Sequence, residues 1–236
     1  MVCGKQTVSQ PHNLRTPSWS AELEIYGKKL TEIKKDSESP SNPLVGLLMT
    51  ENLSYAEHTR MLAGKLRSGI YALKANRHLP NIARKNIYFA CIHSHLSYAG
   101  IIMGTAPKSC TKQLQIIQNA AIRILADEKY NASTGILYRK LNIMRTEDIF
   151  RTQACTYGWK FINTKLPPAI QAMMNKGQER ARQIQPRQFR NSNIKHLSPI
   201  DYITREWNAL PLLIKRAPSI NVLKKDLCKH FIGKYQ

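Results

Sequence analysis

The chain has 236 residues, enough for one large domain or two small ones. Of these residues 42% are hydrophobic but only 8% are aromatic, so the core must consist mainly of Leu, Ile, Met and Ala. This composition favours helices over strands. The formal net charge is +21, from 36 Lys and Arg against 15 Asp and Glu, and such an excess is typical of a chain that meets a polyanion. The five cysteines are not paired at short spacing, which argues against a disulfide-built secreted scaffold and predicts an intracellular protein, nuclear or cytoplasmic.

The N-terminal part predicts little stable structure. Residues 1–21 are polar and contain Pro11 and Pro17, so we predict a disordered tail. Residues 22–33 alternate weakly between apolar and polar, which predicts a short β-hairpin with Gly27 at its turn. The stretch 36–43 has the composition of a loop, so hairpin and loop together fill residues 22–43. Because an isolated hairpin is marginal in water, this one needs a partner sheet.

Helical patterns follow, and we predict a helical bundle over residues 44–166. Ser54 and Glu57 have the spacing of a capping box, which starts a helix that continues to about Arg77. The apolar stripe of this helix is formed by Leu62, Leu66, Ile70 and Leu73.

Further helices are predicted over about 82–98, 111–126 and 136–141, and from 146 to the prolines at 167–168. The helix over 111–126, capped by Ser109, is apolar nearly all round, which is typical of a buried central helix. The stretch 86–107 carries no formal charge. Its two histidines, His93 and His95, and its two glycines favour a buried helix over a membrane span, so no membrane contact is predicted.

The C-terminal part changes character. Residues 176–196 are polar and basic and hold too few apolar residues to bury a face, so 167–197 is predicted to be a basic linker. A small C-terminal helical segment follows over 198–236, with Trp207 in one helix and Ser219 capping the last. The predicted fold class is therefore mainly α: a helical bundle with a short N-terminal β-hairpin and a small C-terminal helical segment.

No catalytic constellation is visible in the sequence. Nucleotidyl transfer needs clustered carboxylates for two metal ions, but the aspartates are scattered, at Asp36, Asp127, Asp148, Asp201 and Asp226. His93 and His95, two residues apart on a helix, point to different faces, so one metal ion cannot easily take both. Cys-x-x-Cys pairs, Gly-rich phosphate loops and Gly-x-Ser-x-Gly elbows do not occur. We therefore predict that this chain alone is not an enzyme and holds no cofactor.

The basic residues remain as candidates. Residues 1–54 hold six basic and six acidic residues, whereas no Asp or Glu occurs between residues 58 and 126. Positive side chains on the flank of a helix whose other face is buried are held out to meet phosphates, although a solvated face explains any single one equally well. The predicted nucleic-acid-binding residues are Arg60, Lys65, Arg67, Lys74, Arg84, Lys85, Arg187 and Arg190. Three of these, Arg60, Arg67 and Lys74, recur every seven residues on one flank of their helix, and Lys65 lies on the other.

Several stretches, in this order, resemble the region after the palm in reverse transcriptases of non-LTR (LINE-like) retrotransposons. Leu23–Leu30 (LEIYGKKL) resembles the family's hairpin after the palm. Leu44–Leu48 (LVGLL) and Leu53–His58 (LSYAEH) resemble its entry to the thumb. A family segment "His-Pro-x-Leu-x-Tyr … Trp-Gly" is resembled by Ile92–Tyr98 (IHSHLSY) followed by Gly104. The family helix "Leu-Gln-x-x-Gln-Asn-x-Ala-x-Arg" is resembled by Leu114–Ile124 (LQIIQNAAIRI), and two later landmarks by Leu166–Pro168 and Trp207–Pro211 (WNALP).

The resemblance covers residues 22–236 and includes departures. Tyr55 and Met103 stand where the family usually has Trp. The family's polymerase motif, an aromatic residue followed by x-Asp-Asp, would precede residue 22 and is not in this sequence. The resemblance therefore implies a fragment of an RNA-directed DNA polymerase without its palm, where the family binds Mg²⁺. In the family the thumb helices grip the template–primer, so RNA or DNA, mainly as duplex, and the palm domain are the implied partners.

Two other interpretations stay open. One is a non-catalytic helical adaptor whose basic face binds an acidic protein. The other is a pseudogene product without a function.

Overall fold

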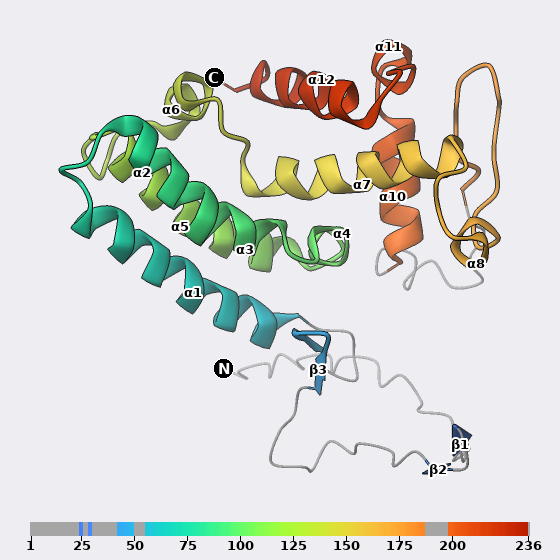
Figure 1. The fold of residues 1–236 in the computed structure, drawn as a ribbon, viewed down its shortest axis with the longest axis horizontal. Coiled ribbons are helices and arrows are strands. Elements are labelled where there is room, and N and C mark those ends of the chain that lie inside the picture. Colours follow the sequence, from blue (N-terminus) through green and yellow to red (C-terminus); the bar gives the residue numbers. More distant parts are fainter. Residues whose placement is uncertain (1–23, 26–27, 30–41, 50–54, 187–197, 236) are drawn as a thin grey trace, which may run out of the picture. The chain divides into compact units, whose positions relative to one another are not determined.

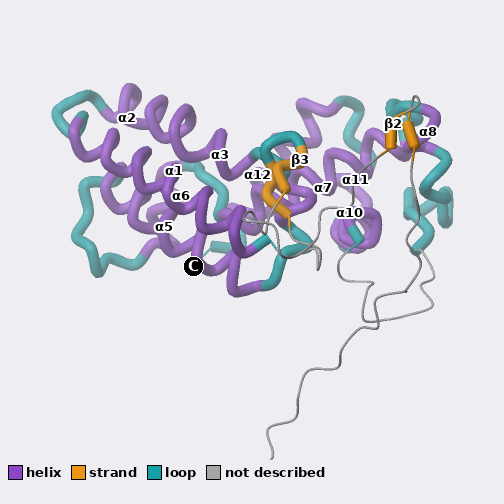
Figure 2. The backbone as a smooth tube through the Cα atoms, turned by 90° about the horizontal axis from the view of Figure 1, so that it is seen from below, coloured by secondary structure: helices purple, strands orange, loops and turns teal. Residues whose placement is uncertain are grey.

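The computed structural model describes residues 24–25, 28–29, 42–49, 55–186 and 198–235. The chain forms two compact units, residues 1–38 and 39–236. The described part of the second unit is dominated by helices (Figure 2), which confirms the predicted mainly-α class. The predicted tail over residues 1–21 lies outside the described residues.

In the first unit, two short strands pair antiparallel: β1 (Glu24–Ile25) and β2 (Lys28–Lys29). Their register places Glu24 opposite Lys29 and Ile25 opposite Lys28, as in a β-hairpin. This confirms the predicted hairpin, while Gly27 itself lies outside the described residues.

The second unit contains a hairpin followed by helices (Figure 1). Its elements are β3 (Asn42–Leu44), β4 (Leu47–Met49), α1 (Ala56–Ala75), α2 (Asn81–Tyr88), a π-helical turn (Phe89–His93), α3 (Ser94–Ser97), α4 (Gly100–Met103), α5 (Lys108–Leu125), α6 (Thr134–Leu141), α7 (Thr146–Ile162), α8 (Pro168–Gln171), α10 (Pro199–Asn208), α11 (Leu212–Lys215) and α12 (Ile220–Ile232).

The β3–β4 hairpin was not predicted, because its first strand falls in the predicted loop and its second in the predicted bundle. Val45 and Gly46 form its turn with φ angles of 51° and 79°, and a two-residue turn with positive φ at both positions matches the twist of paired strands. Two later side chains hold the hairpin: His58 Nδ1 accepts from the Leu48 N–H (3.4 Å), and the Tyr98 hydroxyl donates to the Val45 carbonyl. Three motifs that are separate in sequence therefore meet at one place.

Helix α1 begins one residue later than predicted, with Tyr55 rather than Ser54 at its N-cap; Ser54 lies outside the described residues. The predicted apolar stripe is correct, because Leu62, Leu66 and Leu73 are buried. Each buried leucine contributes roughly 1.5–3 kcal/mol through removal of apolar surface from water. This stripe fixes α1 against α5 and the π-helical turn.

The helix predicted over 82–98 forms as a continuous run of α2, the π-helical turn and α3. The π-helical turn inserts one extra residue into the helical turn and brings its backbone close to α1. A Cβ atom placed on Gly69 would lie 2.9 Å from the Cys91 carbonyl oxygen and 2.7 Å from the Ile92 side chain. Only glycine leaves room for this crossing.

Two glycines within α1 provide a matched test of that crossing. A Cβ placed on Gly64 meets nothing within 4 Å, so Gly64→Ala should raise the free energy of unfolding by about 0.5–1 kcal/mol through helix propensity alone. Gly69→Ala should instead lower it by about 1–3 kcal/mol, because α1 and the π-helical turn must separate. Urea unfolding of both variants measures the difference, and an equal gain in both would contradict this packing.

Helix α5 starts at Lys108 after Pro107, earlier than predicted, and Ser109 is not its N-cap. It is not buried all round: Ile116 is 60% exposed, whereas Gln118, a polar residue, is fully buried. The number of apolar residues in α5 did not predict which of its faces is buried, because the buried face includes amide side chains.

Those amides cap another helix. Gln118 Oε1 accepts from the Thr146 N–H (2.8 Å) and hydroxyl (2.9 Å), and its Nε2 donates to Tyr88 Oη and the Met144 carbonyl (both 2.9 Å). Gln115 Oε1 accepts from the same Thr146 N–H (2.9 Å). The first turn of α7 thus receives its cap from α5, where backbone N–H groups lack helical partners.

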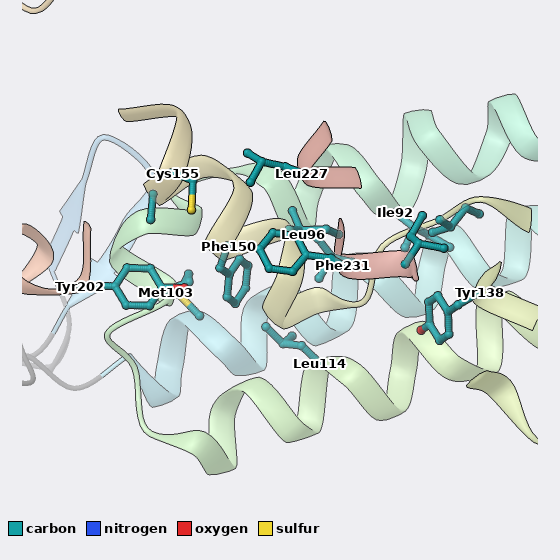
Figure 3. Close-up of a cluster of buried hydrophobic side chains, with 14 of the residues drawn as sticks. Ile92, Leu96, Met103, Leu114, Tyr138, Phe150, Cys155, Tyr202, Leu227 and Phe231 are labelled. Atoms are coloured by element: carbon teal, nitrogen blue, oxygen red, sulfur yellow. The ribbon is translucent and has the colours of Figure 1, made fainter. Parts of the chain in front are cut away.

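Helix α7 lies at the centre of the second unit: α4 and α5 pack against it, α12 lies along it and α10 crosses it (Figure 1). Figure 3 shows the resulting core, in which Phe150 and Cys155 of α7 lie among Tyr202 of α10 and Leu227 and Phe231 of α12. The C-terminal helices share this core, so residues 198–235 do not form the separate segment that was predicted.

The predicted linker over 167–197 is wrong as far as residue 186. Met174 and Ile184 are buried, and Lys176 pairs with Ile184 as an isolated β-bridge. The Trp207 indole N–H donates to the Arg182 carbonyl (2.7 Å), and the Asn208 side chain exchanges two hydrogen bonds with the Ile184 backbone (2.8 and 3.0 Å). Met174 and Ile184 thus pack a segment that is otherwise polar against the rest of the protein. The composition of the segment did not predict this packing.

Tyr235 fastens the C-terminal part to the junction between α6 and α7. Its hydroxyl donates to Asp148 Oδ2 (2.6 Å) and accepts from the Arg145 N–H (3.0 Å), and the Arg145 guanidinium lies 4.5 Å from its ring centroid. The Arg139 side chain donates to its carbonyl. Tyr235 is 4% exposed, so this fastening is part of the core.

Candidate nucleic-acid interface

The outer side of α1 presents positive charge. Arg60, Arg67 and Lys74 are exposed and follow one another at about 10 Å along the helix axis, on a side that faces away from the buried stripe. Arg60 forms an ion pair with Glu57 (2.7 Å), whereas Arg67 and Lys74 have no ion pair with any described residue. As far as the described residues go, two of the three cations can therefore meet an external anion.

Between these cations the surface of α1 carries an exposed aromatic ring and a position without a side chain. Tyr71 is 75% exposed on the same side of α1, and Gly64 leaves the helix backbone uncovered. An exposed ring beside cations can stack on a base or ribose, and a side-chain-free position lets a rigid surface approach closely.

Lys65 lies apart from this group. It projects from the other flank of α1, where it lines a pocket of about 360 Å³ together with His58, Ser94, His95 and Tyr98. Burial, followed by the charge of Lys65, lowers the pKa of His58, so this imidazole is neutral at pH 7. The predicted set on α1 therefore divides into an outer group and a pocket residue.

Arg84 is not available to nucleic acid, which corrects its assignment as a phosphate-binding residue. Its side chain is 5% exposed and donates two hydrogen bonds to Asp127 (2.6 and 2.8 Å), joining α2 to the turn after α5. Arg77 also contacts Asp127 (3.1 Å). The hydrogen bonds from Arg84, then those from Arg77, lower the pKa of Asp127 to about 2, so it remains charged. Asp127 is thus an ion-pair centre that joins α2 and the turn after α1 to the turn after α5.

Lys85 also has an internal partner: its Nζ donates to the Leu141 carbonyl (2.7 Å) at the end of α6. A cation at a helix C-terminus donates to a free carbonyl and interacts favourably with the negative end of the helix dipole. This contact accounts for Lys85 without a nucleic acid. Arg187 and Arg190 lie outside the described residues.

Two cations at the start of α5 were missed. Lys108 and Lys112 are exposed, have no ion pair with a described residue, and line a cleft of about 900 Å³ between α5, α7 and α10. In that cleft Arg151 is neutralised by Glu147 (2.6 Å) and Glu206 (3.4 Å). Placing the helix start at residue 111 hid the i, i+4 spacing of the two lysines.

His93 and His95 have different surroundings, as their spacing predicts: the His93 ring lies against Phe89 (centroids 5.0 Å apart), whereas His95 lines the pocket beside Lys65. Within the described ranges, no three His, Cys, Asp or Glu side chains are grouped so that they could hold a metal ion. In the same residues, no helix has both the length and the apolar character needed to span a membrane; within the uncharged stretch 86–107 the helical run ends at Ser97, before α4.

Comparison of the chain with family models, with curated proteins and with solved structures gives no match in any of the three.

Proposed function

We propose that this chain binds the phosphate backbone of a nucleic-acid duplex, without reading sequence, through the outer face of α1. One observation carries the proposal: Arg67 and Lys74 lie on the solvent side of a helix whose other side is buried, and neither forms an ion pair with a described residue. Lysine and arginine in such positions contact phosphates but carry no base specificity.

The resemblance extends this proposal to an origin. We propose that the chain is the thumb and post-thumb part of a non-LTR retrotransposon reverse transcriptase, with polymerisation and Mg²⁺ binding assigned to the palm of the parent enzyme. The contacts of the hairpin at residues 42–49 with His58 and Tyr98 support it, because three stretches that each resemble a different family motif lie against one another. The burial of Gln118 and Trp207 also supports it, since each belongs to a stretch that resembles a family motif and each has a structural role in the core.

Salt dependence tests the binding. The logarithm of affinity for a B-DNA duplex should fall linearly with the logarithm of salt concentration, with a slope of about −0.9 per phosphate contacted. A double variant, Arg67→Gln with Lys74→Gln, should flatten that slope by about 1.8 and weaken binding at low salt. Fluorescence anisotropy at several salt concentrations measures both quantities.

A matched control comes from α12, where Lys224 and Lys225 are also exposed. Replacing both by Gln removes the same charge and should leave the slope within about 0.5 of the wild type. An affinity that stays constant with salt would exclude the electrostatic contact. Equal losses in the two double variants would show that net charge, not the face of α1, carries the binding.

A further inference from the structure

The pocket beside Lys65 has an apolar part, from Met61 and Leu62, and a part lined by side chains that can donate hydrogen bonds. It is formed by α1, α3 and the turn of the β3–β4 hairpin, and it has a volume of about 360 Å³. No Asp or Glu is among the described residues that line it, and two histidines and a lysine are. A pocket with this composition selects against cations.

His58 lines the pocket with a ring nitrogen that makes no hydrogen bond to a described residue. Its side chain is buried, at 2% exposure, and its Nδ1 accepts a hydrogen bond from the Leu48 N–H. A neutral imidazole that accepts at Nδ1 carries its proton at Nε2. This Nε2–H has no hydrogen-bond partner among the described residues, although His58 lines the pocket.

The neighbouring groups determine what the donor can meet. The Tyr98 hydroxyl donates to the Val45 carbonyl and the Ser94 hydroxyl to the Ala90 carbonyl, so neither proton is available. Lys65 is exposed and has no ion pair with a described residue, and its charge already disfavours protonation of His58. An anion between Lys65, His58 and His95 would be attracted by the charge of Lys65 and could accept the N–H of the neutral His58 ring.

We propose that this pocket binds one phosphate group, held by His58 Nε2–H, the Lys65 ammonium and the His95 imidazole. Three donors from two helices suit a group with several strong acceptor oxygens, and a flexible lysine is a common phosphate ligand. Because residues two apart on a helix do not share a face, the pocket is separate from Arg67 and from the proposed duplex contact. The phosphate can therefore come from free phosphate or from a nucleic-acid backbone.

Titration of the full chain with inorganic phosphate, at constant ionic strength in chloride, tests the site through the NMR signals of the His58 and His95 side chains. Both signals should shift and saturate together. Lys65→Gln should weaken phosphate binding by about tenfold or more, since a charge-assisted hydrogen bond is lost. Lys224→Gln, which removes the same charge from the exposed side of α12, should change it by less than about twofold.

A silent His58 signal, or equal phosphate binding by wild type and Lys65→Gln, would overturn the proposal. His95→Gln gives a second variant, and it should weaken phosphate binding while leaving the thermal unfolding temperature close to that of the wild type. Addition of duplex separates the sources: displacement of phosphate from His58 identifies a backbone phosphate, and retention identifies free phosphate. Duplex binding that depends on Arg67 but never perturbs His58, together with no phosphate binding, would refute this site and leave the proposed function standing.

Discussion

Replacing Gln118 by Met should lower the free energy of unfolding by about 3–5 kcal/mol, because several buried groups lose their partner while the side-chain volume is nearly kept. Gln118 is fully buried and makes four hydrogen bonds to Tyr88, Met144 and Thr146. Each buried donor or acceptor left unsatisfied costs about 1–3 kcal/mol. Urea unfolding followed by circular dichroism measures the loss.

The same substitution at Gln113 is the control, since that residue is exposed on the same helix and should respond by less than about 0.5 kcal/mol. A double-mutant cycle with Gln115→Met adds a sharper test. Both amides accept from the Thr146 N–H, so the two losses should not be additive. Independent, additive losses would mean that the two glutamines do not share the cap of α7.

The second large effect is expected for Trp207→Ala, which should lower the free energy of unfolding by about 3–5 kcal/mol through the cavity that it leaves. Trp207 is fully buried, and its ring packs so closely on α7 that a Cβ atom on Gly158 would lie 2.9 Å from Cγ. Its N–H also holds the Arg182 carbonyl, so the segment after α8 should become accessible to protease.

Trp207→Phe separates the two roles. It keeps much of the ring volume but removes the N–H, so the segment around Arg182 should be released at a cost of about 1–3 kcal/mol. Tyr130→Ala is the control for loss of an aromatic ring at an exposed position, 89% accessible, and should change stability by less than about 0.5 kcal/mol. If Trp207→Ala left stability at the Tyr130→Ala level, the packing of α10 on α7 would be wrong.

The elements that could be predicted are those with a local signal. The stripe on α1 and the hairpin around residues 26–27 follow from spacing within a single element, and both are present. The β3–β4 hairpin was missed because each strand has three residues and its turn places Val45, a β-branched residue, at positive φ. The segment up to residue 186 was missed because its order depends on Trp207, which comes later in the chain.

The candidate site shows the same division. Arg67 and Lys74 could be placed on an exposed flank because the apolar residues of their own helix fix its orientation. Arg84 could not, since its partner Asp127 is 43 residues away and a distant ion pair leaves no pattern in the sequence. The unused N–H of His58 is likewise set by the Leu48 amide, a contact that depends on a hairpin absent from the prediction.

The contact between Tyr235 and Asp148 also has a consequence for synthesis. The two residues are 87 positions apart, so at 5–20 residues per second the ribosome adds Tyr235 about 4–17 s after Asp148. Throughout that interval Asp148 has only its helix neighbour Arg151 as a side-chain donor among the described residues, and the side of α7 that α12 later covers stays exposed to solvent. The nascent chain must therefore be kept from aggregating until α12 emerges from the ribosome, and emergence of α12, rather than completion of α7, sets the moment at which this part of the fold closes.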